Sequence, residues 1–166
     1  TATGPGARLL AQRLSSPLTD PAAINARLDS IDFLAGDARL REDVKSSLGA
    51  APDMARALTR LSLDRGGPRD LAAIGEGLTR ARGLATTLAH ERAPAEIRSA
   101  LIALEARDSG GFSDLIRLLK EALIDGPPLL ARDGGFIAKG FDPGLDAVIG
   151  LRDESRRVIA TLEADY

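Results

Sequence analysis

The sequence predicts an all-α protein, in which a bundle of several helices is followed by a short β-hairpin and a long C-terminal helix. Three observations support this fold class. Aromatic residues make up only 3% of the 166 residues, so the core must consist mainly of aliphatic side chains. Ala and Leu are strong helix formers, and the β-branched residues that favour strands are sparse. Apolar residues also recur at helical spacing from end to end.

The first half of the chain predicts several helices separated by Gly and Pro. Asp20 followed by Pro21 is typical of an N-cap with proline at the first helical position, where its missing N–H costs nothing. Breaks are expected at Gly36 and Asp37 and again between Gly49 and Pro52. The apolar stripes are Leu9, Leu10 and Leu14; Ile24, Leu28 and Ile31; Leu40, Val44 and Leu48; and Met54, Leu58 and Leu61.

The most regular helical pattern follows Gly67 and Pro68. Its apolar residues lie three and four apart, as in helices that pack nearly parallel to their neighbours. Gly75, Gly77 and Gly83 each weaken this helix by up to about 1 kcal/mol relative to alanine, so we expect its apolar face to be buried. The stripe is Leu71, Ile74, Leu78, Ala81, Ala85 and Leu88, and two shorter stripes follow: Ile97, Leu101 and Leu104, then Phe112, Leu115, Leu119 and Leu123.

The pattern changes in the segment GPPLLARDGGFIAKGF, whose prolines and glycines are too many for a helix interior. Short apolar runs at 129–131 and 136–138 flank a turn at Asp133-Gly134 or Gly134-Gly135. Glycine permits the positive φ of a tight turn, so we expect a two-stranded hairpin here. Asp142 and Pro143 then open the last helix. The expected organisation is a helical core at 1–128, a hairpin and turn at 129–141, and the last helix at 142–166.

The glycine-rich segment does not match the known phosphate-binding motifs. A Walker loop needs a lysine and a Ser or Thr after its last glycine, whereas Lys139 precedes Gly140 and Phe141 follows it. A dinucleotide fingerprint needs three spaced glycines between a strand and a helix, and this segment lacks that spacing. We therefore expect a structural turn that leads into the last helix. A phosphate-handling enzyme that uses the 132–140 loop remains a third hypothesis, beside the two that are described below.

No combination of residues in the sequence predicts catalysis or metal binding. The chain has no cysteine, which excludes disulfides, thiolate catalysis and Cys-based metal sites. The single histidine, His90, is expected to be exposed near a helix end, and no nucleophile–base pair can be argued from it. The acidic pairs Asp29/Asp32 and Glu42/Asp43 are interpreted as solvated helix faces. We therefore predict no catalytic, cofactor-binding, metal-binding or DNA-binding residue in this chain.

Charge and hydropathy narrow the possible partners. The net charge is −2 and the signs alternate along the chain, which does not favour nucleic-acid binding through the whole surface. No apolar run approaches the length of a membrane span, and no signal peptide is visible. We expect a cytoplasmic protein without a membrane partner.

Three segments together resemble one known family. The most specific is 126–146, with Pro127, Pro128, Arg132, Asp133, Gly134, Gly135, Ile137, Gly140, Asp142, Leu145 and Asp146 at the positions of an Arg-Asp-Gly-Gly motif. Segment 65–71 resembles an Arg-x-Pro-Arg-Asp-Leu motif through Arg65, Pro68, Arg69, Asp70 and Leu71, with two residues rather than one between Arg65 and Pro68. Segment 1–34 contributes Gly6, Arg8, Leu9, Leu10, Leu14, Pro17, Leu18, Asp20, Ile24 and Arg27. These segments resemble the central core and lever region of the MutS family of DNA mismatch repair proteins. Departures are Arg13, where tryptophan is common, Ala55, where an acidic residue is common, and Phe141, where tyrosine is common.

The resemblance implies a division of labour within a longer protein. The mismatch-reading Phe-x-Glu element would lie N-terminal to this segment and the Walker ATPase C-terminal to it, and the DNA clamp would follow the lever helix. The chain would then link the clamp to the ATPase mechanically, without being an enzyme itself. The parent protein would bind mismatched DNA, ATP and magnesium through other domains, pair with a second copy, and act with downstream mismatch repair proteins.

A different class of function is also open. A freestanding helical scaffold would bind a protein partner through an exposed apolar stripe. Helix-like sequence reaches both ends of the chain, which favours a piece of a longer protein over this alternative.

Overall fold

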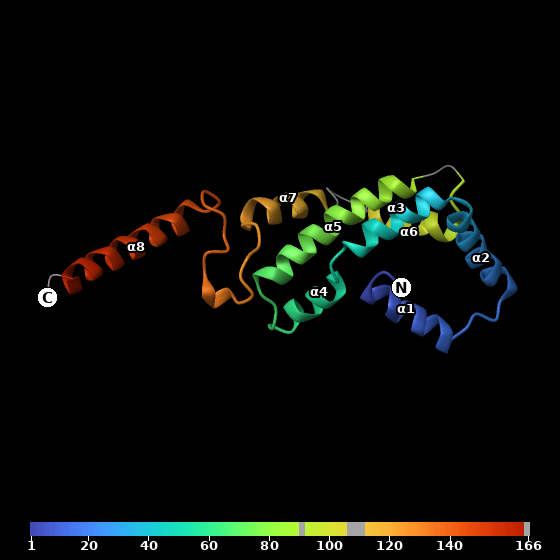
Figure 1. The fold of residues 1–166 in the computed structure, drawn as a ribbon, viewed down its shortest axis with the longest axis horizontal. Helices are drawn as coiled ribbons and strands as arrows, with labels where there is room; N and C mark the ends of the chain where they lie inside the picture. Colours follow the sequence, from blue (N-terminus) through green and yellow to red (C-terminus); the bar gives the residue numbers. More distant parts are fainter. Residues whose placement is uncertain (90–91, 106–111, 165–166) are drawn as a thin grey trace.

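The structure, a computed structural model, describes residues 1–89, 92–105 and 112–164. Within these residues, seven helices form an elongated body, and an eighth projects from one end of it (Figure 1). The predicted all-α class is confirmed. In chain order the helices are α1 (Gly4–Ser15), α2 (Pro21–Gly36), α3 (Ala38–Gly49), α4 (Met54–Ser62), α5 (Pro68–Leu88), α6 (Ala95–Glu105), α7 (Ser113–Ala122) and α8 (Pro143–Ala164), with a 3₁₀ turn at Ala131–Asp133.

Acidic residues begin several of these helices, because free backbone N–H groups in the first turn need acceptors. The Asp20 carboxylate accepts hydrogen bonds from the N–H groups of Ala22 and Ala23 at the start of α2, as the sequence predicts. Asp37 caps α3 and Asp53 caps α4 in the same way. The helix boundaries in this half of the chain therefore follow from local chemistry.

Helix α5 lies at the centre of the body, where it contacts α3, α4, α6 and α7 (Figure 1). Two of its glycines are buried at these contacts. A Cβ atom added at Gly75 would lie 3.2 Å from Cβ of Leu119 on α7, and one added at Gly77 would collide with the side chain of Met54 on α4. The glycines that weaken α5 as an isolated helix thus allow its neighbours to approach closely.

The hydrophobic core of the body is small. Its buried apolar residues come from five helices and one loop, and several are alanines: Val44, Ala57, Ala85, Ala93, Ile97 and Ile116. Many large apolar side chains remain at the surface, among them Leu14 at 74% exposure and Ile102 at 71%. A body of this shape has much surface for its volume, so it cannot bury every leucine.

The predicted β-hairpin at 129–138 is wrong. Residues 131–133 form the 3₁₀ turn, and the run 136–138 pairs with the end of α7 instead of with 129–131. The N–H of Ile124 donates to the Phe136 carbonyl at 3.1 Å, and the N–H of Ala138 donates to the Ala122 carbonyl at 2.8 Å. The carbonyls in the last turn of a helix have no partner within it, and here the returning chain supplies one. The positive φ expected at the turn is present, at +68° for Gly134 and +67° for Gly135.

Helix α8 extends away from the body, and none of its described residues is buried (Figure 1). Its exposed apolar side chains include Leu145, Val148, Leu151, Val158, Ile159 and Leu162. Among the described residues, no helix is both long enough and apolar enough to cross a membrane. The functional question is therefore how the root of α8 is attached to the body.

Candidate functional site at the root of the projecting helix

The attachment begins at the first turn of α5. Asp70 accepts a hydrogen bond from the N–H of Gly67 at 2.9 Å, which caps α5, and its two carboxylate oxygens lie 3.2 Å from Nε of Arg60 on α4. Arg60 also donates to the Arg65 carbonyl at 2.8 Å. Pro68, at the first position of α5, is fully buried. These contacts give the α4–α5 loop a defined conformation in which Arg69 can reach the segment that leads to α8.

The segment 127–129 lies directly against this first turn. Nε of Arg69 donates to the Pro127 carbonyl at 2.9 Å, although the two residues are 58 positions apart in the sequence. Pro127 is buried. A Cβ atom at Gly67 would collide with the Leu129 carbonyl oxygen, so the close approach requires glycine. The Pro-Arg-Asp and Pro-Pro motifs therefore meet in space.

The returning segment is attached to α7 and then turns into α8. The backbone bonds of 136–138 to 122–124 hold it on the body. The N–H of Gly140 donates to the Asp146 carboxylate at 2.8 Å. Asp142 accepts from the N–H groups of Gly144 at 2.8 Å and Leu145 at 3.1 Å, as expected for the N-cap of α8. Two acidic residues thus shape the start of this helix, one from before it and one from within it.

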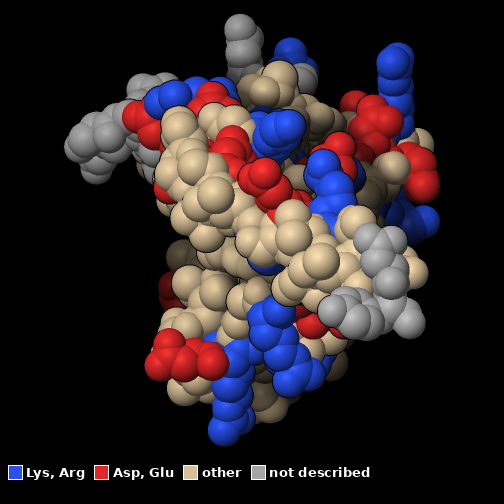
Figure 2. Space-filling model, turned by 90° about the vertical axis from the view of Figure 1, so that its left-hand side faces the viewer, with Lys and Arg blue, Asp and Glu red and all other residues tan. Residues whose placement is uncertain are grey.

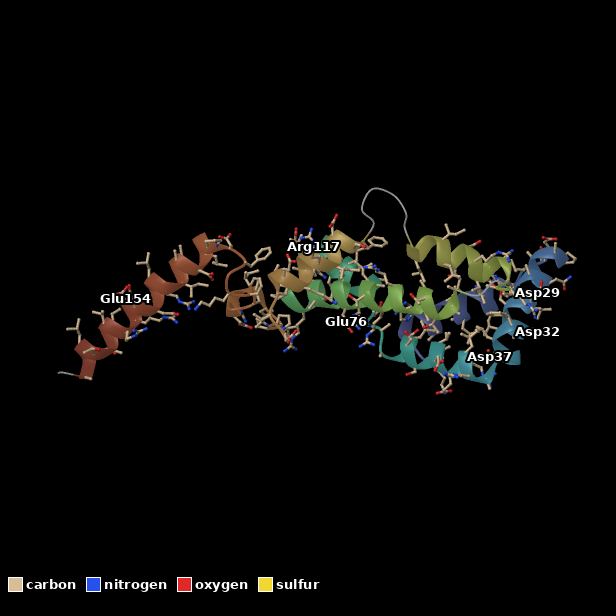
Figure 3. The ribbon with its side chains drawn as sticks, turned by 90° about the horizontal axis from the view of Figure 1, so that it is seen from above. Asp29, Asp32, Asp37, Glu76, Arg117 and Glu154 are labelled. Atoms are coloured by element: carbon tan, nitrogen blue, oxygen red, sulfur yellow. The ribbon has the colours of Figure 1, made fainter. Side chains whose placement is uncertain are left out.

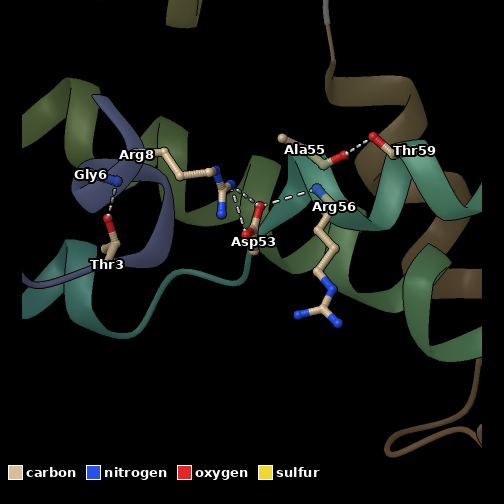
Figure 4. Close-up of polar contacts among 7 residues, drawn as sticks. All are labelled: Thr3, Gly6, Arg8, Asp53, Ala55, Arg56 and Thr59. Carbon is tan, nitrogen blue, oxygen red and sulfur yellow. Dashed lines mark hydrogen bonds and ion pairs between the residues drawn. The ribbon is translucent and has the colours of Figure 1, made fainter. Parts of the chain in front are cut away.

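The opposite end of the chain is attached through ion pairs. Arg8 of α1 donates from Nη2 to both carboxylate oxygens of Asp53, at 3.1 and 2.9 Å, while the N–H of Arg56 donates to the same carboxylate (Figure 4). The backbone bond from Arg56, followed by the bond from Arg8, holds the pKa of Asp53 below its ordinary value. Arg13 pairs with Glu96 of α6 at 2.8 Å. Helix α1 is therefore held on the body by charged contacts.

The acidic residues that the sequence analysis considered lie at the surface of the body. Asp29 and Asp32 are exposed on α2, at the opposite end of the molecule from Glu154 of α8 (Figure 3). Glu42 and Asp43 are exposed on α3, and His90 lies outside the described residues. No group of three or more acidic or histidine residues with a metal-binding arrangement occurs in the part of the chain that the structure describes.

The glycine-rich loop also keeps its charged residues apart from any enclosed site. Arg132 and Lys139 are both exposed. Acidic and basic side chains are mixed on the face of the molecule from which α8 projects, with several basic side chains along its lower edge (Figure 2). The geometry of the loop is therefore that of a structural connection between α7 and α8.

Sequence reasoning placed Gly67 at the boundary between two helices but did not predict the contacts that Gly67, Arg69 and Asp146 make. Their motifs stood out only through the resemblance, because each acts on a residue or segment that local patterns do not pair with it. Asp53, immediately before Met54, carried a usable signal, since an acidic residue before an apolar stripe is a typical N-cap.

The described residues define a class of protein: a helical structural domain that holds one projecting helix by its root. Residues 1–165 match the family model described as MutS domain III, and the chain belongs to this family. The resemblance found in the sequence is thereby confirmed. The chain is 52% identical over 166 residues to the DNA mismatch repair protein MutS of Cereibacter sphaeroides, which covers 100% of the chain and 18% of that relative.

Two further relatives agree. The chain is 51% identical over 164 residues to the MutS protein of Paracoccus denitrificans, covering 99% of the chain and 18% of the relative. It is 48% identical over 167 residues to the MutS protein of Rhodopseudomonas palustris, covering 100% and 18%. The chain thus spans less than a fifth of the length of the curated relatives that it matches.

Proposed function

We propose that this chain is the core and the beginning of the lever of a MutS-like mismatch repair protein, and that it links a DNA clamp to an ATPase mechanically. The observation that carries the proposal is a contrast: the segment leading into α8 is bonded to α5 and to the end of α7, while none of the described residues of α8 is buried. An α-helix rises about 1.5 Å per residue. A helix that is held at one end can therefore transmit a displacement over its whole length. In this proposal the core is 1–128, the connection 129–141, and the lever 142–166.

The rest of the proposed function belongs to the longer protein. The relatives are named DNA mismatch repair proteins, and the chain matches only 18% of each. We propose that the parent binds mismatched DNA, ATP and magnesium through its other domains, and that the chain itself hydrolyses no ATP. The parent would form a homodimer, act with downstream mismatch repair proteins, and work in the cytoplasm.

The test is to break α8 in the longer protein. Val158 lies in the second half of α8 and is 55% exposed, so Val158→Pro removes one helical hydrogen bond without disturbing a core. The cost is about 3 kcal/mol or more locally, with a kink. Basal ATP hydrolysis should remain largely intact, whereas its response to mismatched duplex should weaken because the clamp and the ATPase are then joined by a bent rod.

The control is Val158→Ala, which shortens the same side chain but keeps the helix. Both variants are compared by steady-state ATP hydrolysis with and without mismatched duplex, on protein shown by melting to be folded. An unchanged DNA response in folded Val158→Pro protein would rule out the lever function.

The alternative is a freestanding scaffold that binds a protein partner through the exposed apolar residues of α8, of which Val148 is 63% and Leu151 is 65% exposed. The encoding reading frame discriminates between the two. A clamp segment and a Walker motif after residue 166 would rule out the scaffold. A nucleotide-binding assay on the chain tests the third hypothesis, an enzyme that uses the 132–140 loop.

A further inference from the structure

The connection between the body and α8 has one part that is firmly held. The segment 136–138 is bonded to the end of α7, with the Ala138 N–H donating to the Ala122 carbonyl at 2.8 Å and the Ile124 N–H donating to the Phe136 carbonyl at 3.1 Å. Phe136, Ile137 and Ala138 are also half-buried. Up to Ala138, the chain therefore moves with the body.

The residues after Ala138 are held much less. Lys139 and Gly140 are exposed, and Gly140 has a φ of +90°. Among the described residues other than Gly140 and its two chain neighbours, no heavy atom lies within 4 Å of the position that a Cβ atom at Gly140 would occupy. Glycine crosses between positive and negative φ at little steric cost, so rotation here meets neither a neighbouring side chain nor a large backbone barrier.

The start of α8 forms a unit of its own beyond this joint. Asp142 caps the helix through the N–H groups of Gly144 and Leu145, and the N–H of Asp146 donates to the Asp142 carbonyl at 3.0 Å. Every one of these bonds lies on the helix side of Gly140. The cap therefore moves with α8 and does not fix the angle between α8 and the body.

One side-chain hydrogen bond within residues 138–146 crosses the joint. The N–H of Gly140 donates to Oδ2 of Asp146 at 2.8 Å, which links the turn to the first turn of α8. The acceptor is a half-buried carboxylate, and hydrogen bonds to charged acceptors are stronger than those to neutral ones. A backbone bond, from the Phe141 N–H to the Ala138 carbonyl at 3.2 Å, also spans Gly140. It is longer and joins neutral groups, so the Asp146 bond is the stronger of these two restraints across the joint.

We propose that Gly140 is the hinge of α8, and that the Asp146 carboxylate is a positioning group that latches the helix at one angle to the body. The proposal rests on the lever function proposed above and deepens it by naming the residues that set the angle of the lever. With the latch closed, displacement of α8 is passed to the body through 136–138. With the latch open, α8 swings about Gly140 and the displacement is lost in the joint.

The absence of cysteine from the chain makes a direct measurement simple. Glu76 on α5 and Glu154 on α8 are both exposed and lie on either side of the joint (Figure 3). Both are changed to cysteine in the 166-residue chain and spin-labelled, and the distance distribution is measured by pulsed electron paramagnetic resonance. Hydrogen exchange of the Gly140 amide reports on the latch itself.

Asp146→Ala should broaden the distance distribution and accelerate exchange of the Gly140 amide by roughly fivefold, the effect of losing one hydrogen bond. Asp146→Asn keeps an acceptor oxygen and should restore much of the protection. The matched control is Asp153→Ala on the same helix, where the carboxylate pairs with the neighbouring Arg152 and lies beyond the joint. Gly140→Ala, which disfavours a φ of +90°, should shift the mean distance.

Two outcomes would overturn the hinge: a distance distribution in Asp146→Ala as narrow as in Asp153→Ala, or Gly140 exchange that does not change. Helical circular dichroism shows that each variant is folded.

The lever function is judged separately, in the longer protein. If Asp146→Ala frees α8 but the DNA response of ATP hydrolysis is unchanged, the hinge stands and the lever function fails. If Val158→Pro weakens that response while Asp146→Ala leaves α8 fixed, the lever stands and the latch fails.

Discussion

Helices α5 and α8 are nearly equal in length, with 21 and 22 residues, and both carry an apolar stripe and internal glycines. Their surroundings differ completely. Helix α5 contacts four other helices, and two of its glycines are buried, whereas no described residue of α8 is buried. A helical stripe therefore indicates which face could be covered, but the neighbours decide whether it is covered.

The difference also suggests a difference in cooperativity. Because α5 contacts four other helices, we expect it to unfold together with the body. Because α8 is attached mainly at its root, we expect it to fray or break without unfolding the body. Two predictions test this contrast in the isolated chain, and a third extends it to the attachment of α1, from the largest expected effect to the smallest.

Proline placed inside α5 should destabilise the body strongly, whereas proline placed inside α8 should leave the stability of the body nearly unchanged. Leu78→Pro in α5 should lower the free energy of unfolding by at least about 3 kcal/mol, because it removes a helical hydrogen bond and displaces packed neighbours. Val158→Pro in α8 should change the melting of the body by less than about 0.5 kcal/mol, although it reduces the helical signal. Thermal and urea unfolding followed by circular dichroism measure both. A similar loss in the two variants would show that α8 is part of the cooperative body.

Leucine introduced at two glycines of α5 should separate packing from helix propensity. Gly77→Leu places a side chain against Met54 and should cost about 3 kcal/mol in overpacking. About 1 kcal/mol of this is offset by the better helix former, so the net loss is about 2 kcal/mol. Gly83→Leu, where no atom of another described segment lies within 4 Å of an added Cβ atom, should stabilise the chain by up to about 1 kcal/mol.

Urea unfolding of these two variants is the measurement, and Gly150→Leu in α8 extends it to the projecting helix. At Gly150 too, no atom of another described segment lies within 4 Å of an added Cβ atom. Gly150→Leu should therefore increase local helix content as Gly83→Leu does, but leave the free energy of unfolding of the body unchanged. Equal effects at Gly77 and Gly83 would contradict the close approach of α4 to α5.

The smallest effect concerns the ion pair that attaches α1. The pKa of Asp53 is lowered from 3.8 in the folded chain, first by the backbone bond from Arg56 and then by Arg8. A carboxylate with a lowered folded pKa adds stability that is present above its unfolded pKa and is lost as the pH falls through the folded pKa. The stability difference between the native chain and Asp53→Asn should therefore be full near neutral pH and shrink below a pH of about 4.

Urea unfolding as a function of pH checks this, with Asp20→Asn as the control, because Asp20 caps α2 without an arginine partner in the described contacts. The pH-dependent difference should be larger for Asp53. The same slope in both variants would mean that Arg8 adds nothing to the cap at α4.

Particular residues show how much of this structure could be read in advance. Asp20 with Pro21 and Asp142 with Pro143 correctly predicted two helix starts, because a cap involves only residues within one turn of each other. Gly134 and Gly135 correctly predicted positive φ, because the conformation of a turn also depends on neighbouring residues alone. The hairpin prediction failed because the choice between 129–131 and the end of α7 as a partner for 136–138 depends on where α7 ends in space.

The sequence by itself determined the all-α class, most helix starts, the turn at the two glycines, and membership in the MutS family, because caps, periodicity and motifs are properties of neighbouring residues. Only the tertiary structure decided that Gly67 and Arg69 receive the segment 127–129, and that α5 is covered while α8 is not. These depend on contacts between residues far apart in the chain, whose cost in chain entropy is repaid only when several elements pack at once.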